Sequence, residues 1–499
     1  MNISDYLLEK VDDHKVAAIM EDAQYTYGDI RWAAAKMANA LQACGIGLGD
    51  SVGLLGANSL FWIGSYLAIM KLGAVAVPFS TMAMPDEVQA QIEFSDCKAV
   101  CVQNRFLMRY ESALTGRTLL NDDCLEEDFA GSWQDLPFDP DFDDTHEAAL
   151  MFTSGTTQRP RAVRISHKNI RANTDSIIEY LELDENERIM VILPFYYCFG
   201  TSLLHTHMRV NGSMVISNGF TFPEKVLDMM EHYDCTGIAG VPSTYQTLIR
   251  NTSMGKREMA TLRKVQQAGG KLPAVQIREM VEMLPNAHYY TMYGQTEATA
   301  RLSYLPPHML ETKLGSIGMG IPGVELRVMS ESGEAVKPGE VGEIWAKGDN
   351  ISVGYLNDLE ASKDKFIDGV LHTGDLATVD EDGYIFVVDR KADFIKSYGY
   401  RVSSQQVEDC VLSLPEVVAA AAVGEPDAMR GEAIVVYVTL REGSSLRPED
   451  IIAHCRNKLA RHMLPKRVEI LDSLPLSAQG KVLKSELRKR GNTDKKAVS

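Results

Sequence analysis

Strand-like runs alternate with helix-like patterns along about the first 390 residues, and this alternation limits the fold more than any other feature of the sequence. Residues 162–181, AVRISHKNIRANTDSIIEYL, illustrate the pattern. A short strand leads to Ser166, a predicted helix N-cap, and apolar residues from Ile170 to Leu181 then recur at helical spacing. Elements that alternate in this way predict an α/β class, with mixed β-sheets flanked by helices.

After Arg390 the pattern changes to that of a compact α+β unit. Ser403 precedes Gln406 by three residues, which is the spacing of a capping box. Two predicted strands follow, and then a helix that starts near Pro448. We therefore expect a large N-terminal domain, residues 1–390, of mixed β-sheets flanked by helices, and a small α+β C-terminal domain, residues 391–499.

The net charge and the first residues exclude some classes of protein. A formal charge of -18 in 499 residues argues against nucleic acid as the main partner, because a phosphate backbone needs a basic face. The start of the chain, MNISDYLLEKVDDHK, lacks the basic and apolar regions of a signal peptide. The 8 cysteines form no CxxC pair, which favours reduced thiols and a cytoplasmic protein.

The most membrane-like segment is residues 60–79, LFWIGSYLAIMKLGAVAVPF. It contains Lys71, Gly73 and Pro78, which do not suit a continuous apolar span. We expect a buried helix followed by a core strand, and no integral membrane segment.

Residues 150–163, LMFTSGTTQRPRAV, place four hydroxyl side chains around one glycine and add two arginines. Hydroxyls and cations gathered in one loop predict an anion as ligand, most readily a triphosphate. The loop lacks the paired glycines and the Lys-Ser/Thr of a Walker A sequence. Taken alone, it is explained at least as well by a simple turn after a strand.

Three other patterns carry no function by themselves. Gly318-Met-Gly320-Ile-Pro-Gly323 spells GxGxxG but precedes a predicted strand, whereas a dinucleotide fingerprint opens a helix. His205 and His207 have no Cys or carboxylate nearby at the spacing of metal ligands. The sequence contains no GxSxG elbow, so a serine hydrolase of the α/β type gains no support.

Five further segments gain meaning from their order along the chain. They are Tyr293-Gly-Gln-Thr-Glu297, Leu371-His-Thr-Gly-Asp-Leu376, Asp389-Arg390, the stretch IKSYGYRVSS at residues 395–404, and LPLSAQGKVLKSELR, in which Lys481 follows a glycine. Together they resemble the AMP-forming adenylating enzymes: acyl- and aryl-CoA synthetases, peptide-synthetase adenylation domains and beetle luciferases. The chain is closest in type to the acyl-CoA synthetases, and the resemblance covers nearly all of it.

The resemblance implies a mobile C-terminal domain that rotates between two half-reactions about a hinge at Ala392. It also implies an ATP site with Mg²⁺, in which Thr153, Glu297 and Lys481 are catalytic. Lys481 would bridge the acyl carboxylate and the ribose side of the α-phosphate. The phosphate-binding residues would be Thr153, Ser154, Gly155, Thr156, Thr157 and Arg161, with Glu297 and Thr156 near the metal. The rest of the ATP site would be Gly269, Gly270, Tyr293, Gly294, Gln295 and Thr296 around adenine, and Asp375 and Arg390 around ribose.

In the second half-reaction the family uses coenzyme A as co-substrate. The thiol would approach along Lys396, Ser397, Gly399 and Arg401. A glycine is understandable in a narrow tunnel, which tolerates no side chain.

Two segments depart from the family pattern. The phosphate loop reads Thr157-Gln158-Arg159-Pro160-Arg161-Ala162 where relatives have Thr-Gly-x-Pro-Lys-Gly. Arg161 keeps the positive charge and can bind phosphate bidentately. The hinge position holds Ala392 in place of the usual Asp or Lys, which affects the rotation more than the chemistry.

The expected acid pocket contains no carboxylate for an α-ammonium group, so an α-amino acid is an unsuitable substrate. The expected wall residues are Tyr197, Phe199, Val241, Pro242 and Tyr245, which suit a fatty or other apolar or aryl acid. Plain core packing explains each of them equally well.

These patterns predict an ATP-dependent carboxylic acid–thiol ligase that forms an acyl-CoA through an acyl-adenylate and releases AMP and pyrophosphate. One alternative is a ligase that loads a carrier protein or an amine, so an acyl carrier protein is a candidate partner. A second alternative is a non-catalytic relative that binds nucleotide or acyl groups. The residues predict no oligomeric state.

Overall fold

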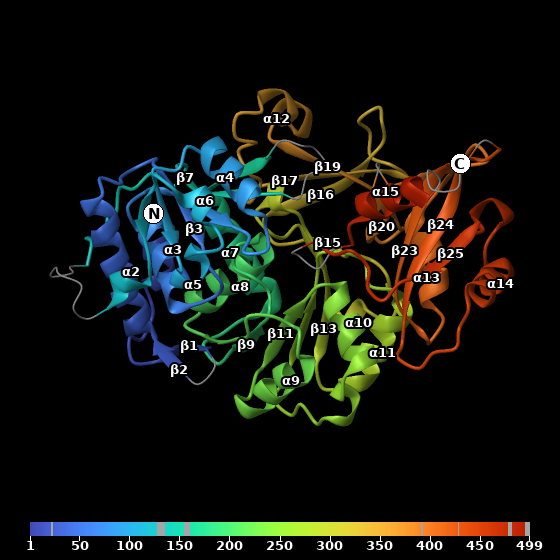
Figure 1. Ribbon diagram of the computed structural model, residues 1–499, viewed down its shortest axis with the longest axis horizontal. Helices are drawn as coiled ribbons and strands as arrows, with labels where there is room; N and C mark the ends of the chain where they lie inside the picture. Colours follow the sequence, from blue (N-terminus) through green and yellow to red (C-terminus); the bar gives the residue numbers. More distant parts are fainter. Residues whose placement is uncertain are drawn as a thin grey trace.

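Four β-sheets form the frame of the computed structural model (Figure 1). The structure describes residues 1–20, 23–126, 135–153, 160–390, 393–427, 429–477 and 482–494, with the backbone alone for Arg390, Arg401 and residues 491–494. Mixed sheets with helices on their faces confirm the predicted α/β and α+β class.

The first sheet has six strands in the order β6–β5–β3–β4–β7–β8. Its strands are β3 (Ser51–Leu55), β4 (Val75–Phe79), β5 (Ala99–Val102), β6 (Thr118–Leu120), β7 (Glu147–Phe152) and β8 (Ala162–Ser166). All neighbours are parallel except β7 and β8, which form an antiparallel hairpin at one edge. That hairpin carries the hydroxyl loop.

The second sheet has nine strands in the order β15–β14–β13–β12–β11–β9–β10–β1–β2. The strands are β1 (Val16–Met20), β2 (Ala23–Thr26), β9 (Arg188–Val191), β10 (Ser213–Ile216), β11 (Gly237–Gly240), β12 (Lys264–Gln267), β13 (His288–Tyr293), β14 (Ser303–Leu305) and β15 (Met319–Gly320). The strands from β13 to β1 run parallel. Loops at the carboxyl ends of β12 and β13 carry the predicted adenine-binding residues, as expected for a parallel sheet.

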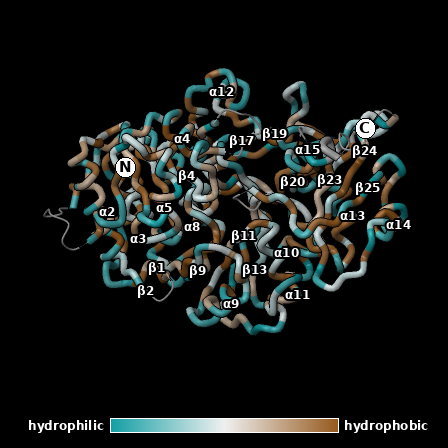
Figure 2. Tube along the Cα trace, in the orientation of Figure 1, coloured by the Kyte–Doolittle hydropathy of each residue, from teal (hydrophilic) through white to brown (hydrophobic). Residues whose placement is uncertain are grey.

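A smaller antiparallel sheet of β16 (Val324–Met329), β17 (Gly342–Gly348), β18 (Phe366–Ile367), β19 (Val370–Val379) and β20 (Ile385–Arg390) carries Asp375. The last sheet consists of β21 (Ile395–Ser397), β22 (Tyr400–Val402), β23 (Val417–Asp427), β24 (Gly431–Leu440) and β25 (Arg467–Ile470). It has its own apolar core with helices α13 (Ser404–Leu412) and α14 (Pro448–Lys458). Figure 1 shows this C-terminal unit in orange and red beside α10 (Pro242–Asn251) and β20, and Figure 2 shows apolar residues along its strands.

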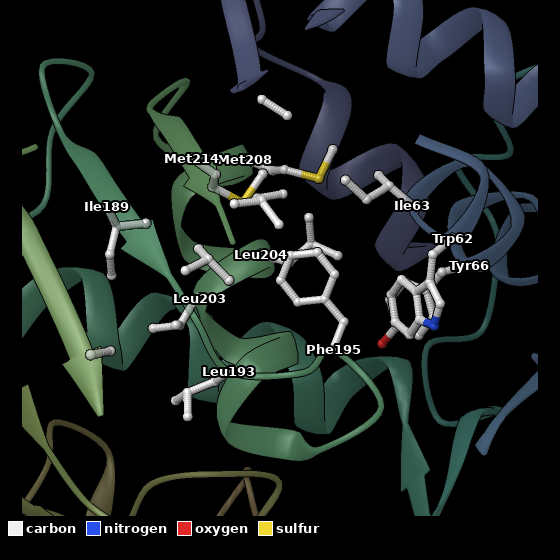
Figure 3. Packing of buried hydrophobic residues seen from close by; sticks show 14 of the residues in the cluster. Trp62, Ile63, Tyr66, Ile189, Leu193, Phe195, Leu203, Leu204, Met208 and Met214 are labelled. Carbon is white, nitrogen blue, oxygen red and sulfur yellow. The ribbon is translucent and has the colours of Figure 1, made fainter. Parts of the chain in front are cut away.

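The largest apolar core joins the first two sheets through helices α2 (Tyr27–Ala43), α3 (Leu60–Lys71) and α8 (Cys198–Arg209). Trp62 stacks on Tyr66, with ring centroids 4.9 Å apart, and also contacts Phe195, at 5.4 Å (Figure 3). Phe195 begins the segment that leads into α8. The core therefore fixes the position of the predicted acid pocket, which starts two residues later.

Several local predictions are confirmed. Residues 60–79 form the buried helix α3 and the core strand β4, and no helix among the described residues is long and apolar enough to span a bilayer. Ser166 caps α7 (His167–Leu181) by accepting from the Asn169 amide, and Ser403 caps α13 by accepting from the Gln406 amide. Pro448 is the first residue of α14.

Candidate active site

The β7–β8 hairpin holds the two ends of the hydroxyl loop together. The amide of Thr153 donates to the carbonyl of Arg161, at 3.1 Å, directly beyond the last strand pair, Phe152 with Ala162. The predicted phosphate-binding residues Ser154, Gly155, Thr156 and Thr157, together with Gln158, lie outside the described residues. The structure therefore positions the two ends of the loop, at Thr153 and Arg161.

Tyr355 connects the basic end of this loop to the predicted magnesium-binding carboxylate. Its hydroxyl donates to Oε1 of Glu297, at 2.8 Å, and the Arg161 guanidinium lies 5.0 Å from the centroid of its ring. Arg161 also pairs with Asp358, at 3.5 Å. Tyr355 is only 4% exposed, and burial, followed by the Glu297 charge, raises its pKa well above the usual range. The hydroxyl is thus a permanent donor at neutral pH.

Tyr293 and Asp375 bring the predicted adenine and ribose positions together. The Tyr293 hydroxyl donates to Oδ2 of Asp375, at 2.6 Å, although the two residues come from β13 and β19 in different sheets. Asp375 is 5% exposed, and in the antiparallel ladder it lies opposite Arg390, whose backbone is described. The structure therefore brings these three residues together, and their role in nucleotide binding stays a prediction.

The turn after β13 brings two stretches of backbone into close contact. A Cβ atom on Gly294 would lie 1.9 Å from the carbonyl oxygen of Ala300 and 2.8 Å from the Cα of Arg301. Only glycine fits there, so the segment from Gly294 to Glu297 folds back against residues 300–301. Gln295 follows in extended conformation, and its buried side-chain nitrogen has no hydrogen-bond partner among the residues that the structure describes.

The glycines after β12 contact one of the predicted acid-pocket residues. Gly269 has a φ of +86°, and a Cβ atom on Gly270 would lie 3.1 Å from Cγ of Pro242. Val241 precedes Pro242 and is buried. The predicted adenine and acid sites therefore share a boundary at Gly270 and Pro242.

Tyr197 and Phe199 lie at the start of α8, next to the Tyr293–Glu297 segment. Sγ of Cys198 is 3.5 Å from Oγ1 of Thr296, which joins the two segments. Tyr197 packs edge-on against Tyr196, with ring centroids 4.6 Å apart, and burial raises its pKa. Phe199 lies against the guanidinium of Arg301.

Tyr245 stands apart from the other predicted wall residues. It is fully buried in α10, and its hydroxyl donates to the carbonyl of Gln266, at 2.7 Å. Its ring also packs against Tyr289, with centroids 6.1 Å apart. These contacts are those of a core residue. Plain core packing was the alternative explanation for Tyr245 in the sequence analysis.

The predicted thiol-tunnel residues lie on the β21–β22 hairpin. Lys396 is opposite Arg401 and Ser397 opposite Tyr400, while Tyr398 and Gly399 form the turn with φ of +52° and +81°. No atom of the described residues lies within 4 Å of a Cβ placed on Gly399. In this conformation the glycine is needed because the turn has a positive φ at this position. It is not needed because of a lack of space for a side chain.

Lys481 and Ala392 lie outside the described residues, but their neighbours are in place. Leu476 and Val482 form a β-bridge on either side of the segment that contains Lys481. Close by, Lys484 donates to Oγ of Ser404, at 2.7 Å, and pairs with Glu408, at 2.8 Å. Lys484, which follows the segment, therefore contacts helix α13.

Two polar contacts connect the parts of the chain before and after Arg390. Oδ2 of Asp389 accepts from the Ser404 amide, at 2.7 Å, at the start of α13. Lys271, which follows the Gly269-Gly270 pair, forms an ion pair of 2.7 Å with Asp409. The C-terminal sheet is thereby held next to the predicted adenine site.

A magnesium ion bound together with a nucleotide fits the donors that the structure shows. The described part of the chain contains no group of three or more His, Cys, Asp or Glu side chains placed to hold a metal ion, so a metal cage made of protein alone is absent there. Glu297 offers one carboxylate, which Tyr355 holds through Oε1. Mg²⁺ typically takes one or two carboxylates and completes its octahedron with phosphate and water.

The two histidines of α8 have other contacts. Nε2 of His205 is 3.0 Å from the Tyr66 hydroxyl, and Nδ1 of His207 is 2.9 Å from the Leu203 carbonyl. Burial lowers the pKa of His205 to about 3 and that of His207 to about 4. Both rings are part of the core.

Sequence reasoning missed Tyr355 and Arg301. Tyr355 follows Gly354 in the loop before α12 (Leu359–Lys365), where a Gly-Tyr pair looks like an ordinary turn. Arg301 comes four residues after Glu297, and only its burial reveals it. The available signal for Arg301 was a single charged residue within the stretch ATARLSYL, residues 298–305, which carries no other charge.

Comparison with known proteins supports the same interpretation. Residues 9–356 match the AMP-binding enzyme family, and residues 406–481 match the AMP-binding enzyme C-terminal domain. The chain is 31% identical to a feruloyl-CoA synthase of Amycolatopsis over 482 residues, which cover 96% of this chain and 97% of the relative. It is 29% identical to a long-chain-fatty-acid–CoA ligase of Yersinia pestis, over 91% and 88% of the two chains.

A solved structure is similar over the whole chain. The o-succinylbenzoate coenzyme A synthetase of Bacillus subtilis, in complex with ATP and magnesium ion, superposes with a TM-score of 0.86 at 27% identity, over 97% of this chain and 99% of that one. The fold and the motifs define an adenylating enzyme of the acyl-CoA synthetase type, as the ordered motifs predicted. The chain belongs to the AMP-binding enzyme family.

Proposed function

We propose that this protein joins an apolar or aryl carboxylic acid to the thiol of coenzyme A in two steps. In the first step the carboxylate attacks the α-phosphorus of ATP, forming an acyl-adenylate and releasing pyrophosphate. In the second step the thiolate attacks the acyl carbon, forming the thioester and releasing AMP. The proposal rests chiefly on one observation: Tyr355 links Arg161 to Glu297 beside the Tyr293–Asp375 pair.

The nucleotide would lie between these residues. Arg161 and the hydroxyl loop that starts at Thr153 would bind the β- and γ-phosphates, because aligned donors and a cation offset their charge. Tyr293 would stack on adenine beside Gly269, Gly270 and the backbone of residues 294–296. Asp375 would accept from the ribose hydroxyls, with Arg390 nearby. The Tyr293 hydroxyl already fixes the orientation of the Asp375 carboxylate.

Glu297 would hold Mg²⁺ together with the phosphates and Thr156. When bound, the ion neutralises charge that develops on the phosphate oxygens. The contribution of this chain is to orient the carboxylate. The Tyr355 hydroxyl donates to Oε1 of Glu297 and would thereby hold this carboxylate in one orientation for the ion.

Lys481 would complete the first step. Two anions, the acid and the α-phosphate, must meet, and a lysine ammonium between them reduces their repulsion. The C-terminal unit would then rotate about Ala392 and withdraw the lysine. Residues Lys396, Ser397, Gly399 and Arg401 would next line the approach of the thiol.

The acid would lie beside Tyr197, Phe199, Val241 and Pro242. These residues surround the boundary with the nucleotide site, and none of them carries a charge. The names of the relatives fit an acid of this kind, since one acts on ferulate and another on long-chain fatty acids. Tyr245 is not included because it lies in the core.

Pyrophosphate release over a panel of aryl and fatty acids, with and without CoA, tests this function. A ligase should release pyrophosphate with at least one acid and complete the turnover to a thioester only when CoA is present. Transfer of the acyl group to a purified acyl carrier protein or to an amine, but not to CoA, would show that CoA is not the acceptor. ATP binding without pyrophosphate release on any acid would contradict the proposed function and favour a non-catalytic binding protein.

Replacement of the predicted catalytic lysine separates the two steps. Lys481→Ala should reduce adenylate formation by at least about 100-fold, because the two anions lose the cation between them. The same variant should convert a supplied acyl-adenylate and CoA to thioester at nearly the normal rate. Lys489→Ala, an exposed lysine of α15 (Lys484–Asp494), is the matched control and should retain both rates. Equal losses in both steps would contradict the assigned role.

A further inference from the structure

Arg301 is a buried cation next to the predicted acid pocket. Its side chain is 2% exposed and ranks among the largest fully buried side chains of the described residues. The guanidinium carbon lies 4.0 Å from the centroid of the Phe199 ring, so the two groups stack. Arginine is rarely buried to this degree unless it is paired.

Two of its nitrogens have no acceptor among the described residues. Nε and Nη2 make no hydrogen bond to any of these residues, and no carboxylate of the described residues lies within ion-pair distance of the guanidinium. These two nitrogens point the same way and form the edge of the guanidinium that binds a carboxylate through two parallel hydrogen bonds. The unsatisfied part of Arg301 is therefore a complete carboxylate-binding edge.

The backbone of Arg301 is firmly placed. Its amide donates to Oδ1 of Asn173, at 3.3 Å, and its carbonyl accepts from the side-chain nitrogens of Asn173, at 3.1 Å, and Asn350, at 2.8 Å. Its Cα lies directly behind Gly294. The side chain thus starts from a fixed point beside the Tyr293–Glu297 segment.

An apolar cluster lies against the Phe199 ring, on which the guanidinium stacks. Phe199 packs against a cluster that contains Tyr180, Met292 and Ala268, the residue before Gly269. The Tyr180 hydroxyl donates to the sulfur of Met292, at 3.0 Å. Tyr180 is buried, and the nearby Arg301 partly offsets the rise of its pKa that burial causes. A cation in such surroundings lacks the counter-charge that would repay its desolvation.

We propose that Arg301 binds a second carboxylate on the substrate acid, at the end remote from the carboxylate that is adenylated. The substrate class is then a dicarboxylic acid with an apolar or aryl body. The body would lie along Phe199 and the Tyr180–Met292 cluster, and the second carboxylate would accept from Nε and Nη2. This inference rests on the proposed function, because it uses Phe199 as a wall of the acid pocket.

The packing around Arg301 also shows which side chains must move before an acid can bind. Nε and Nη2 are shielded from solvent, so the Phe199 ring or the guanidinium has to rotate before an acid can enter. Once a carboxylate is bound, the pair is buried and doubly hydrogen-bonded, the arrangement in which an interior ion pair is favourable. A monocarboxylic acid of the same length leaves the edge unsatisfied.

Matched pairs of acids test the proposal. Each pair consists of an alkyl or aryl monocarboxylic acid and the same acid with a terminal second carboxylate, and kcat/KM is measured by pyrophosphate release. The wild-type protein should favour the dicarboxylic member of the best pair by at least about 10-fold, since a site built to hydrogen-bond a group rejects the analogue that lacks it. Arg301→Met, which keeps the length and removes the charge, should abolish or reverse this preference while turning over the monocarboxylic acid.

Two further variants separate recognition from structure. Arg301→Lys keeps the charge without the two-pronged edge and should retain only part of the preference. Arg327→Met, at an exposed arginine of β16, should leave the preference unchanged. Thermal unfolding of each variant identifies any loss of fold. If Arg301→Met lowers kcat/KM for all acids by the same factor, or if the wild type favours the monocarboxylic acid or a neutral hydroxyl or ketone, the proposal is overturned.

A binding measurement keeps this test independent of turnover. Isothermal titration of the preferred dicarboxylic acid in the presence of AMP should give binding that Arg301→Met weakens by at least about 10-fold. Arg301-dependent binding without any pyrophosphate release would disprove the ligase but support the recognition of a second carboxylate. Pyrophosphate release without any effect of Arg301→Met on the choice of acid would support the ligase and disprove the recognition.

Discussion

Tyr355 connects two parts of the predicted nucleotide site that are far apart in the chain. Its hydroxyl holds Glu297 and its ring faces Arg161. A hydrogen bond to a charged group contributes about 1.5–3 kcal/mol. The loss of this bond frees the Glu297 carboxylate to rotate away from the metal position.

Tyr355→Phe should therefore raise the magnesium concentration needed for half-maximal pyrophosphate release by roughly 10-fold or more, and lower the free energy of unfolding by at most about 1.5–3 kcal/mol. Titration of MgCl₂ at fixed ATP measures this effect. Tyr400→Phe, at an exposed tyrosine of the C-terminal hairpin, is the control and should behave as wild type in this step. An unchanged magnesium requirement in Tyr355→Phe would show that the tyrosine does not orient Glu297.

At the residue scale, the sequence identified the groups that lie in motifs. Asp375, Tyr293 and Glu297 could be named because each sits in a short segment of recognisable order, and the structure brings Asp375 and Tyr293 into contact. Tyr355 and Arg301 could not be named, because their roles depend on side chains that meet only in the fold. The sequence-based expectation of an apolar acid, drawn from Tyr197 and Phe199, also took no account of the Arg301 guanidinium that stacks on Phe199.

At the scale of elements, the β21–β22 hairpin shows how a conformation and a function can require the same residue. Gly399 has a φ of +81°, and a side chain there would meet no atom of the described residues. Substitution in this left-handed region costs about 1–2 kcal/mol because of the backbone. The turn would then shift, and with it the predicted path of the thiol.

Gly399→Ala should accordingly slow thioester formation from a supplied acyl-adenylate and leave adenylate formation within about 2-fold of wild type. Rapid-quench measurement of both steps provides the comparison. Gly443→Ala is a matched control, since Gly443 has a φ of +77°, also has no described neighbours, and lies on the loop after β24. Should both glycine variants slow the same step equally, the effect would be one of stability alone.

Caps and local hairpins could be predicted for physical reasons. Ser166 and Ser403 satisfy amides within three residues, so their role is visible in a short stretch of sequence. The order of strands in the nine-stranded sheet could not be predicted. It pairs β1 with β10, almost 200 residues away, through contacts that no local pattern encodes.

For the whole molecule, three buried histidines make stability depend on pH. Burial lowers the pKa of His167 and His205 to about 3 and that of His207 to about 4, from an ordinary 6.5. The unfolded chain binds protons near pH 6.5 and the folded chain does not. The free energy of unfolding is therefore highest above pH 6.5 and falls as the pH drops toward 4.

The slope from these three groups should reach at most about 4 kcal/mol per pH unit near pH 5, where the unfolded state carries the additional protons. Denaturant unfolding followed by tryptophan fluorescence from pH 8 to pH 5 measures it. His205→Asn should reduce the slope by about one third, whereas His14→Gln, at an exposed histidine, should not change it. A free energy of unfolding that stays constant from pH 7 to pH 5 would contradict the buried, neutral state of these rings.

The hydrogen bond between Tyr293 and Asp375 has a consequence for the whole enzyme. It crosses from the nine-stranded sheet to the smaller antiparallel sheet, and it adds to the β-bridge between Gly318, just before β15, and Ile385 of β20. A nucleotide bound to both residues, as proposed, would add its binding energy to the contact between the two sheets. We therefore expect this contact to be less stable in the enzyme without nucleotide than in the enzyme that holds ATP.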